Sequence, residues 1–132
     1  MRRWAQIAGV CGALGCGEDE PTCATFDPSC TPLYSPTFEQ VYNRTLKPSC
    51  AQAGGACHAV DGNAGGVTFG DVEQSYQALV AGGRVTPGDA SCSVLSKRLD
   101  STEVDFQMPP GQRLNAEARC AIGQWIAAGA PR

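Results

Sequence analysis

The sequence has few aromatic residues, no run of basic residues and no long apolar stretch. Aromatics make up 7% of the 132 residues, which predicts a thin core. The formal net charge is -3, and without a basic run the chain is not expected to bind nucleic acid. A membrane-spanning helix needs roughly 20 apolar residues. Because no stretch approaches that length, membrane attachment would require a lipid. The alternating pattern of a half-buried strand is also missing, so we expect an all-α domain.

Glycine, proline and cysteine are plentiful instead. Sixteen Gly and nine Pro predict a loop-rich fold of short elements. Such a small domain usually depends on covalent or cofactor support for its stability. Eight cysteines are too many for a reducing cytosol, which indicates an oxidising compartment.

The first residues read "MRRWAQIAGVCGALGC", which is the layout of a secretory signal peptide. The "ALGC" stretch resembles a lipoprotein signal, so we predict a leader over residues 1–16 and lipidation of Cys16. Ordinary cleavage, with Cys16 left as a free or paired thiol, is the alternative. The expected location is the periplasm or the outer membrane, with a lipid anchor.

Residues 17–36 are polar, acidic and proline-rich, so we expect a flexible tether followed by one domain over residues 37–132. Within the tether, Cys23 and Cys30 could close a small disulfide loop.

About four short helices joined by long loops are expected in the domain. They cover residues 37–46, 71–80, 91–99 and 116–128. Thr37, Asp71 and Asn115 are the expected N-caps, and Pro48 should end the first helix. Cys92 starts the third helix and Cys120 lies in the fourth, which favours a disulfide that clamps these two helices. Two buried thiols are the alternative.

The candidate functional residues lie in the loops. The segment "CAQAGGACHAV" holds Cys50, Cys57 and the sole histidine, His58. A Cys-Cys-His arrangement attaches haem c, although two residues normally separate the cysteines and here there are six. Met108, the sole methionine left after removal of the leader, lies in "DFQMPPGQ". A His/Met pair is the axial ligand set of many electron-transfer haems, because the soft thioether favours ferrous iron.

The chain resembles the planctomycete-type cytochrome c domain of exported bacterial proteins, from about Phe38 to Ala130. Five stretches carry the resemblance in order: "FEQVYNRTLKPSC", "CHAVDGNAGGVTF", "YQALVAGGRVTPGDASCSVLSKRL", "MPPG" and "IGQWIAAGA". The resemblance implies a small cytochrome c-like fold in which Cys50 and Cys57 hold the haem vinyl groups, with His58 as proximal and Met108 as distal ligand. It also implies that the last helix packs across the first, with Trp125 in the core.

The six-residue spacing leaves several interpretations of the cysteine pair open. The haem has two thioethers across a long loop, or one thioether through Cys57, or the haem is absent and Cys50 forms a disulfide with Cys57. A structural zinc is disfavoured, because the spacing fits no common zinc pattern. Arg84 and Arg98 are the nearest cations that could pair with haem propionates.

Two functional hypotheses follow. The first is a lipid-anchored monohaem cytochrome domain that carries single electrons to a redox partner in the envelope. Filled axial positions would make it a carrier and not an enzyme, and its acidic surface would suit a basic partner. The second is a haem-free, disulfide-stapled module with a binding or structural role.

Overall fold

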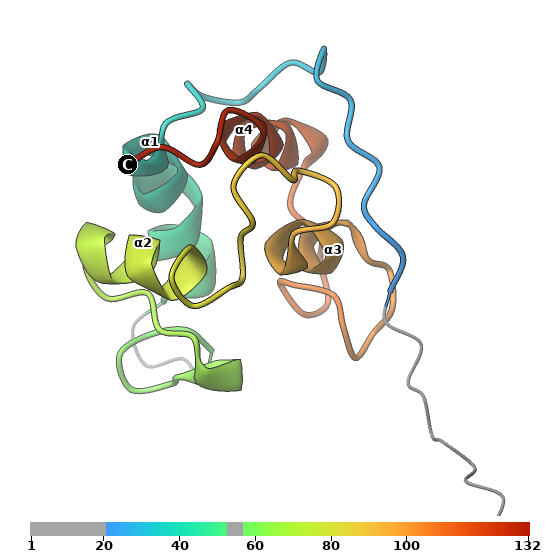
Figure 1. The fold of residues 1–132 in the computed structure, drawn as a ribbon. Coiled ribbons are helices and arrows are strands. Elements are labelled where there is room, and N and C mark those ends of the chain that lie inside the picture. Colours follow the sequence, from blue (N-terminus) through green and yellow to red (C-terminus); the bar gives the residue numbers. More distant parts are fainter. Residues whose placement is uncertain (1–20, 53–56) are drawn as a thin grey trace, which may run out of the picture.

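The computed structural model describes residues 21–52 and 57–132. The predicted leader and the lipidation site at Cys16 therefore lie outside the described residues. Helices and loops make up the described part of the chain, which contains no strand, and this confirms an all-α domain. Figure 1 shows the helices gathered around a common centre. In chain order they are α1 (Phe38–Val41), the π-helix η1 (Tyr42–Cys50), the short 3-10 helix η2 (Ala64–Gly66), α2 (Val72–Leu79), α3 (Val94–Asp100) and α4 (Ala116–Ala127). In the described parts of the chain, no helix is long and apolar enough to cross a membrane.

Three helices begin at the N-caps that the sequence predicts. Thr37, Asp71 and Asn115 all have extended backbone. Each side-chain oxygen accepts a hydrogen bond from the backbone N–H three residues further on, at 3.4, 2.8 and 2.8 Å respectively. These bonds satisfy one of the unpaired donors at each helix start.

The first helix continues past Pro48, where the sequence predicts that it ends. It widens into η1 after Val41 and runs to Cys50. The Ala51 N–H donates to the Leu46 carbonyl at 3.0 Å, which is the five-residue spacing of a π-helix. Its wider turns differ from the α-helical ladder that a proline ring obstructs. The extension matters because it places Cys50 at the end of a helix and not in a loop.

Trp125 of α4 is the centre of the core, as the sequence predicts. Its side chain is fully buried, and its ring centroid lies 5.1 Å from that of Phe38 in α1. Phe38 in turn meets Tyr76 of α2 edge-on, also at 5.1 Å between centroids. The indole N–H donates to the carbonyl of Pro131 at 2.8 Å, so the only polar atom of this buried ring has a partner. The last helix therefore packs across the first.

The predicted disulfide between Cys92 and Cys120 is wrong. Cys92 bonds to Cys23 and Cys120 bonds to Cys30. The four cysteines are paired, but each bond joins the N-terminal segment to the helical domain. The possible small loop closed by Cys23 and Cys30 is therefore also wrong. The sequence-based pairing failed because it joined Cys23 to Cys30 within the acidic, proline-rich segment, which removed both as partners for the helices.

Residues 21–36, which we call the N-terminal strap, run along the outside of α3 and α4 (Figure 1). The Ala24 N–H donates to the Ser91 carbonyl at 2.8 Å, and the Leu33 N–H donates to the Glu117 carbonyl at 3.0 Å. The described part of the expected tether is thus attached to the domain along its length.

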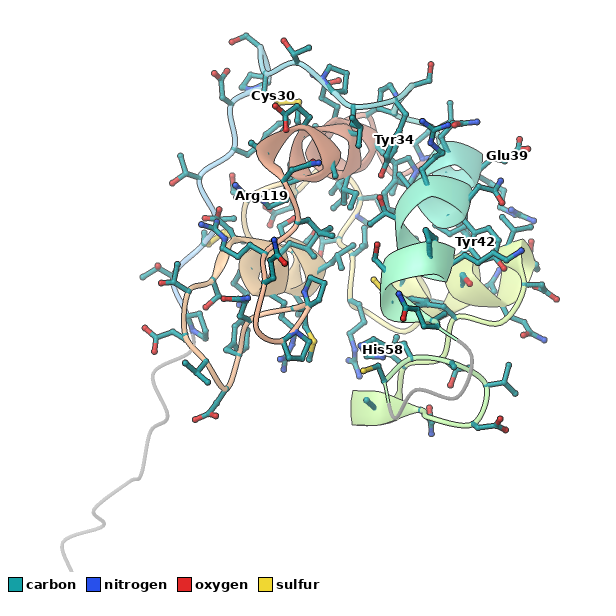
Figure 2. All side chains as sticks on the ribbon, turned by 180° about the vertical axis from the view of Figure 1, so that it is seen from behind. Cys30, Tyr34, Glu39, Tyr42, His58 and Arg119 are labelled. Carbon is teal, nitrogen blue, oxygen red and sulfur yellow. A yellow bond between two sulfur atoms is a disulfide. The ribbon has the colours of Figure 1, made fainter. Side chains whose placement is uncertain are left out.

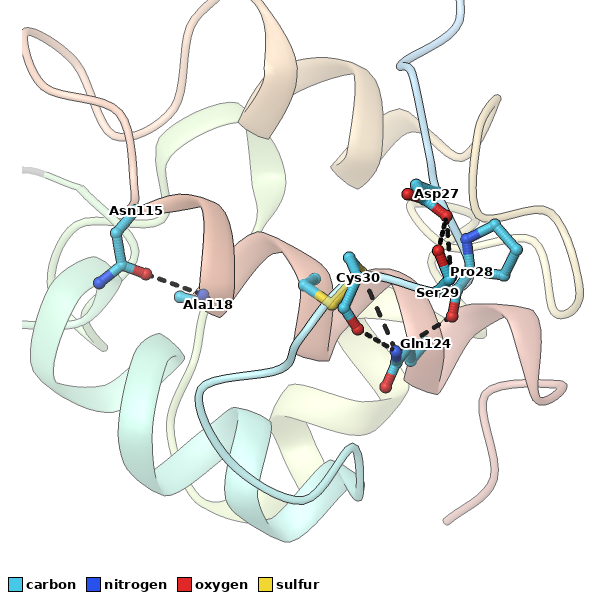
Figure 3. Close-up of a disulfide and its surroundings, with 8 residues drawn as sticks. Asp27, Pro28, Ser29, Cys30, Asn115, Ala118 and Gln124 are labelled. Carbon is cyan, nitrogen blue, oxygen red and sulfur yellow. Dashed lines mark hydrogen bonds between the residues drawn. A yellow bond between two sulfur atoms is a disulfide. The ribbon is translucent and has the colours of Figure 1, made fainter.

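The strap is also packed against α4 by side chains. Gln124 donates through Nε2 to the carbonyl of Cys30 at 2.9 Å, beside the Cys30–Cys120 disulfide (Figure 3). Phe26 lies against Gly123, where an added Cβ would approach its ring to 2.5 Å. A glycine at this position of the helix therefore makes room for the strap.

Asp100, at the end of α3, connects three segments of the fold. Its Oδ1 accepts hydrogen bonds from Arg113 at 2.7 Å and from Arg119 of α4 at 2.6 Å. Its Oδ2 accepts the backbone N–H of Thr25 in the strap at 3.3 Å. Two guanidinium groups and a backbone donor thus converge on one carboxylate, whose side chain is 30% exposed.

Candidate functional site

His58 is held in one orientation by three hydrogen bonds. Its backbone N–H donates to the carbonyl of Cys50 at 3.1 Å, and its own carbonyl accepts the N–H of Phe69 at 2.7 Å. In the ring, Nδ1 lies 3.0 Å from the carbonyl oxygen of Val67. A carbonyl only accepts, so Nδ1 carries the proton, and in the neutral ring Nε2 keeps its lone pair. This is the arrangement of a metal-binding histidine whose second nitrogen is fixed by a backbone acceptor.

The local backbone explains why these bonds form. Asn63 has a left-handed conformation, with φ of 48°, and Gly65 and Gly66 also have positive φ. These residues turn the chain so that Val67 and Phe69 run back past the histidine. The His58 ring packs on Phe69 at 5.3 Å between centroids, and the ring is partly buried. Figure 2 shows His58 at the lower end of the domain, beside the loop that makes this turn.

Cys50 and Cys57 are both free thiols in the structure, so the expected alternative of a Cys50–Cys57 disulfide is not what is observed. Cys50 is the last residue of η1, and its side chain packs against the hydrophobic core. Burial raises the pKa of this thiol to about 11, and the nearby Cys57 adds to the effect. Cys57 is exposed. The two sulfurs therefore differ in environment, although the Cys50–His58 bond holds their segments together.

Met108 is supported by a different part of the fold. It follows the loop that leaves α3, and its backbone N–H donates to the carbonyl of Arg98 in the last turn of that helix at 2.9 Å. Its side chain is partly buried. In both Figure 1 and Figure 2 the loop between α3 and α4 and the loop with His58 lie at the lower end of the domain. The sequence-predicted site residues thus fall into two groups, with Cys50, Cys57 and His58 around the end of η1 and Met108 in the loop after α3, where it is hydrogen-bonded to that helix.

Sequence reasoning missed the residues that fix the two candidate axial ligands. The carbonyl of Val67 holds His58, and no sequence signal identifies a backbone acceptor in a loop. Arg98 and Arg84 were noted only as possible partners of haem propionates. In the structure, Arg98 donates to the carbonyl of Phe106 at 3.2 Å, and Arg84 donates to that of Gly65 at 3.0 Å. Each guanidinium therefore holds one of the two loops.

A zinc site has no support in the described residues. In residues 21–52 and 57–132, no three side chains of His, Cys, Asp or Glu gather in a way that could hold a metal ion. A haem iron makes a different demand, because the porphyrin supplies four of its ligands and the protein supplies one or two. One oriented histidine and one methionine suit that demand.

Comparison with known proteins gives one match. No curated protein and no solved structure matches the chain. The family model for planctomycete cytochrome C matches residues 55–112. The matched stretch includes Cys57, His58 and Met108, and it begins after Cys50. The two disulfides agree with a protein of an oxidising compartment, in which haem c is attached. Residues 55–112 of the chain are thus similar in sequence to the planctomycete cytochrome C family.

Proposed function

We propose that this protein is a monohaem c-type cytochrome domain that carries single electrons in the cell envelope. The observation that carries the proposal is the fixed imidazole of His58. Its Nδ1 is engaged by the Val67 carbonyl, its Nε2 is left to bind iron, and the exposed thiol of Cys57 precedes it directly in the chain. The match to planctomycete cytochrome C gives independent support.

Each candidate residue would have its own role. When bound, haem c supplies an iron that alternates between the ferrous and ferric states. The thiol of Cys57, with that of Cys50 as the second candidate, would attach the porphyrin through its vinyl groups. His58 would be the proximal ligand, and its bond to Val67 fixes the tautomer and the plane of the ring. Met108 would be the distal ligand, whose soft sulfur favours ferrous iron.

The two candidate ligands indicate what kind of function the domain would have. His58 and Met108 would both hold the iron, which would leave no position for a substrate, so the domain would act as a carrier and not as an enzyme. Its partner would be a redox protein of the envelope. The loops that contain the ligands carry Asp61, Glu103 and Asp105, and residues 57–70 and 101–112 contain no lysine or arginine. That local charge suits a basic partner surface. Lipidation at Cys16 would anchor the carrier in the periplasm or at the outer membrane.

A haem-free module is the second candidate. It is favoured by one observation, which is that the Cys50 thiol packs against the core while Cys57 is exposed. The two disulfides and the buried Trp125 would then stabilise a helical fold with a binding or structural role.

The test is to express the full chain together with c-type maturation machinery and to record the spectrum of the purified, denatured protein. Covalent haem should give an absorption band that remains with the polypeptide, and intact mass should rise by one haem. The double variant Cys50→Ala/Cys57→Ala should abolish the covalent band. Met108→Leu, which preserves volume, should keep the covalent haem but remove the methionine-to-ferric-iron band. A colourless protein whose mass lacks the haem would refute the proposal and favour the haem-free module.

A further inference from the structure

Arg98 contacts the loop of Met108 at three points. Its carbonyl accepts the N–H of Met108 at 2.9 Å. Its Nη1 donates to the carbonyl of Phe106 at 3.2 Å, and its guanidinium carbon lies 4.2 Å from the centroid of the Phe106 ring. One residue of α3 thus holds both Met108 and the residue two positions before it.

The other hydrogen bonds of residues 101–107 are local, and they include those from Glu103 N–H to Ser101 Oγ and from Gln107 Nε2 to the Pro109 carbonyl. The loop leaves α3 after Asp100, and its internal bonds are local turns in which the N–H groups of Phe106 and Gln107 both donate to the carbonyl of Glu103. Val104 at its tip is 87% exposed. The side chain of Phe106 is itself only partly buried. Without the guanidinium of Arg98, the segment that precedes Met108 would be fixed mainly by its own backbone turn.

We propose that Arg98 is a positioning residue for Met108, and that its guanidinium holds the methionine sulfur in place to bind iron. The inference rests on the proposed function, because it concerns the distal ligand of that site. Arg98 acts through the loop and does not itself bind the cofactor. A planar guanidinium suits this role, since it donates to a carbonyl and stacks on a ring at the same time.

Two features of the contacts allow a positioning effect of Arg98 to be distinguished from a general loss of stability. The backbone bond between Arg98 and Met108 survives any substitution of the side chain, so a variant removes only the contacts to Phe106. Arg84 offers a matched control, because it also donates to a loop carbonyl, that of Gly65, on the histidine side of the site. Removing either arginine deletes one positive charge and a bond to a loop carbonyl, and Arg84 also donates to the carbonyl of Gly82 at 3.4 Å.

The experiment compares Arg98→Ala, Arg98→Lys and Arg84→Ala in the full, haem-loaded chain. Imidazole added to the ferric protein competes with methionine, so its affinity reports how firmly Met108 is held. We expect Arg98→Ala to bind imidazole about tenfold more tightly than the wild type, which corresponds to the loss of one hydrogen bond and one cation–π contact. Arg98→Lys should recover part of the effect, and Arg84→Ala should change the affinity by less than about twofold by the same reasoning.

A second readout does not depend on haem. Hydrogen exchange at the Met108 amide reports the opening of the loop, and Arg98→Ala should accelerate it about tenfold by the same energies. Urea denaturation of each variant separates this local effect from global unfolding.

The outcomes are distinct. In the first case, the wild type has covalent haem and a methionine band, but Arg98→Ala has the same imidazole affinity and the same amide exchange rate as the wild type. This result overturns the positioning role alone. Equal effects of Arg98→Ala and Arg84→Ala also overturn it, because they indicate general loosening. A wild type without covalent haem overturns the proposed function, and the positioning role with it.

Discussion

Removing the Cys30–Cys120 disulfide should strongly destabilise the fold, although one of its cysteines lies outside the helices. The perturbation is the double variant Cys30→Ala/Cys120→Ala, which leaves no unpaired thiol. The bond spans 90 positions of sequence. Because the Cys23–Cys92 bond is retained, the Cys30–Cys120 bond closes a loop of about 35 residues in the unfolded chain, and in the chain-entropy model it stabilises the folded state by about 4 kcal/mol. Since small domains are stable by about 5–15 kcal/mol, the loss is a large part of the total.

Urea unfolding followed by the fluorescence of buried Trp125 measures the effect. With a urea dependence of about 1.5 kcal/mol per molar, the midpoint should fall by roughly 3 M. Both variants are measured in the haem-free protein, and the control is Cys57→Ser, which removes an exposed thiol and should leave the midpoint unchanged. A fall of less than about 0.5 M in the double variant would show that the strap contributes little to stability, contrary to this reasoning.

The pairing itself can be read by peptide mapping under non-reducing conditions. Trypsin cleaves after Arg84, Lys97 and Arg119, which separates Cys92 from Cys120 while Cys23 and Cys30 stay on one peptide. The structure predicts that this N-terminal peptide is linked to both of the others. Mild acid cleavage at the Asp27–Pro28 bond should then release two separate linked pairs. A direct link between residues 92 and 120 would refute the observed pairing.

Three further predictions concern single side chains. Gly123→Ala should lower the free energy of unfolding by about 1–3 kcal/mol, because its Cβ would clash with the Phe26 ring. In a Phe26→Ala background the same change should instead stabilise the fold by up to about 1 kcal/mol, because alanine favours the helix. The same effect in both backgrounds would contradict the contact. Tyr42→Phe should lower the free energy of unfolding, measured in urea, by about 1 kcal/mol, because the Tyr42 hydroxyl donates to the Gly70 carbonyl at 2.6 Å. An unchanged urea midpoint would show that water replaces this bond. Burial raises the pKa of the Cys50 thiol from 9.0 to about 11, so in the haem-free protein its contribution to stability is complete below about pH 9 and is lost as the pH rises toward 11. The difference in urea midpoint between wild type and Cys50→Ala should therefore fall over this range, and a constant difference would place the thiol in solvent.

The helical elements could be predicted because their signals are local. Each N-cap at Thr37, Asp71 and Asn115 depends on a side chain and a backbone N–H three residues apart. The burial of Trp125 follows from the apolar face of one helix. The end of the first helix could not be predicted in this way, since the burial of Leu46 and the contact of Tyr42 with Gly70 are tertiary, and they accompany a helix that continues through Pro48.

The candidate ligands could be named from sequence, but their supports could not. His58 and Met108 stand out because each is the sole residue of its type in the chain after the predicted leader. The carbonyl of Val67 and the guanidinium of Arg98 are common groups, and their roles depend on a loop geometry that no short pattern encodes. The attachment of the strap to the helices could not be predicted for a related reason. Its composition is that of a linker, while its attachment depends on disulfides to residues 69 and 90 positions away.

If Cys16 carries a lipid, the strap would also set how far the domain can lie from a membrane. The distance from the lipid to the first attachment on the domain would then be counted to the Cys23 disulfide, seven positions on, and not to residue 37. A fully extended chain then reaches about 25 Å, compared with about 75 Å for the longer linker that composition suggests. The domain would turn and tilt close to the lipid surface without leaving it. Its encounters with a redox partner would therefore be collisions within a thin layer along the membrane, and a partner free in the periplasm would have to come to that surface to exchange an electron.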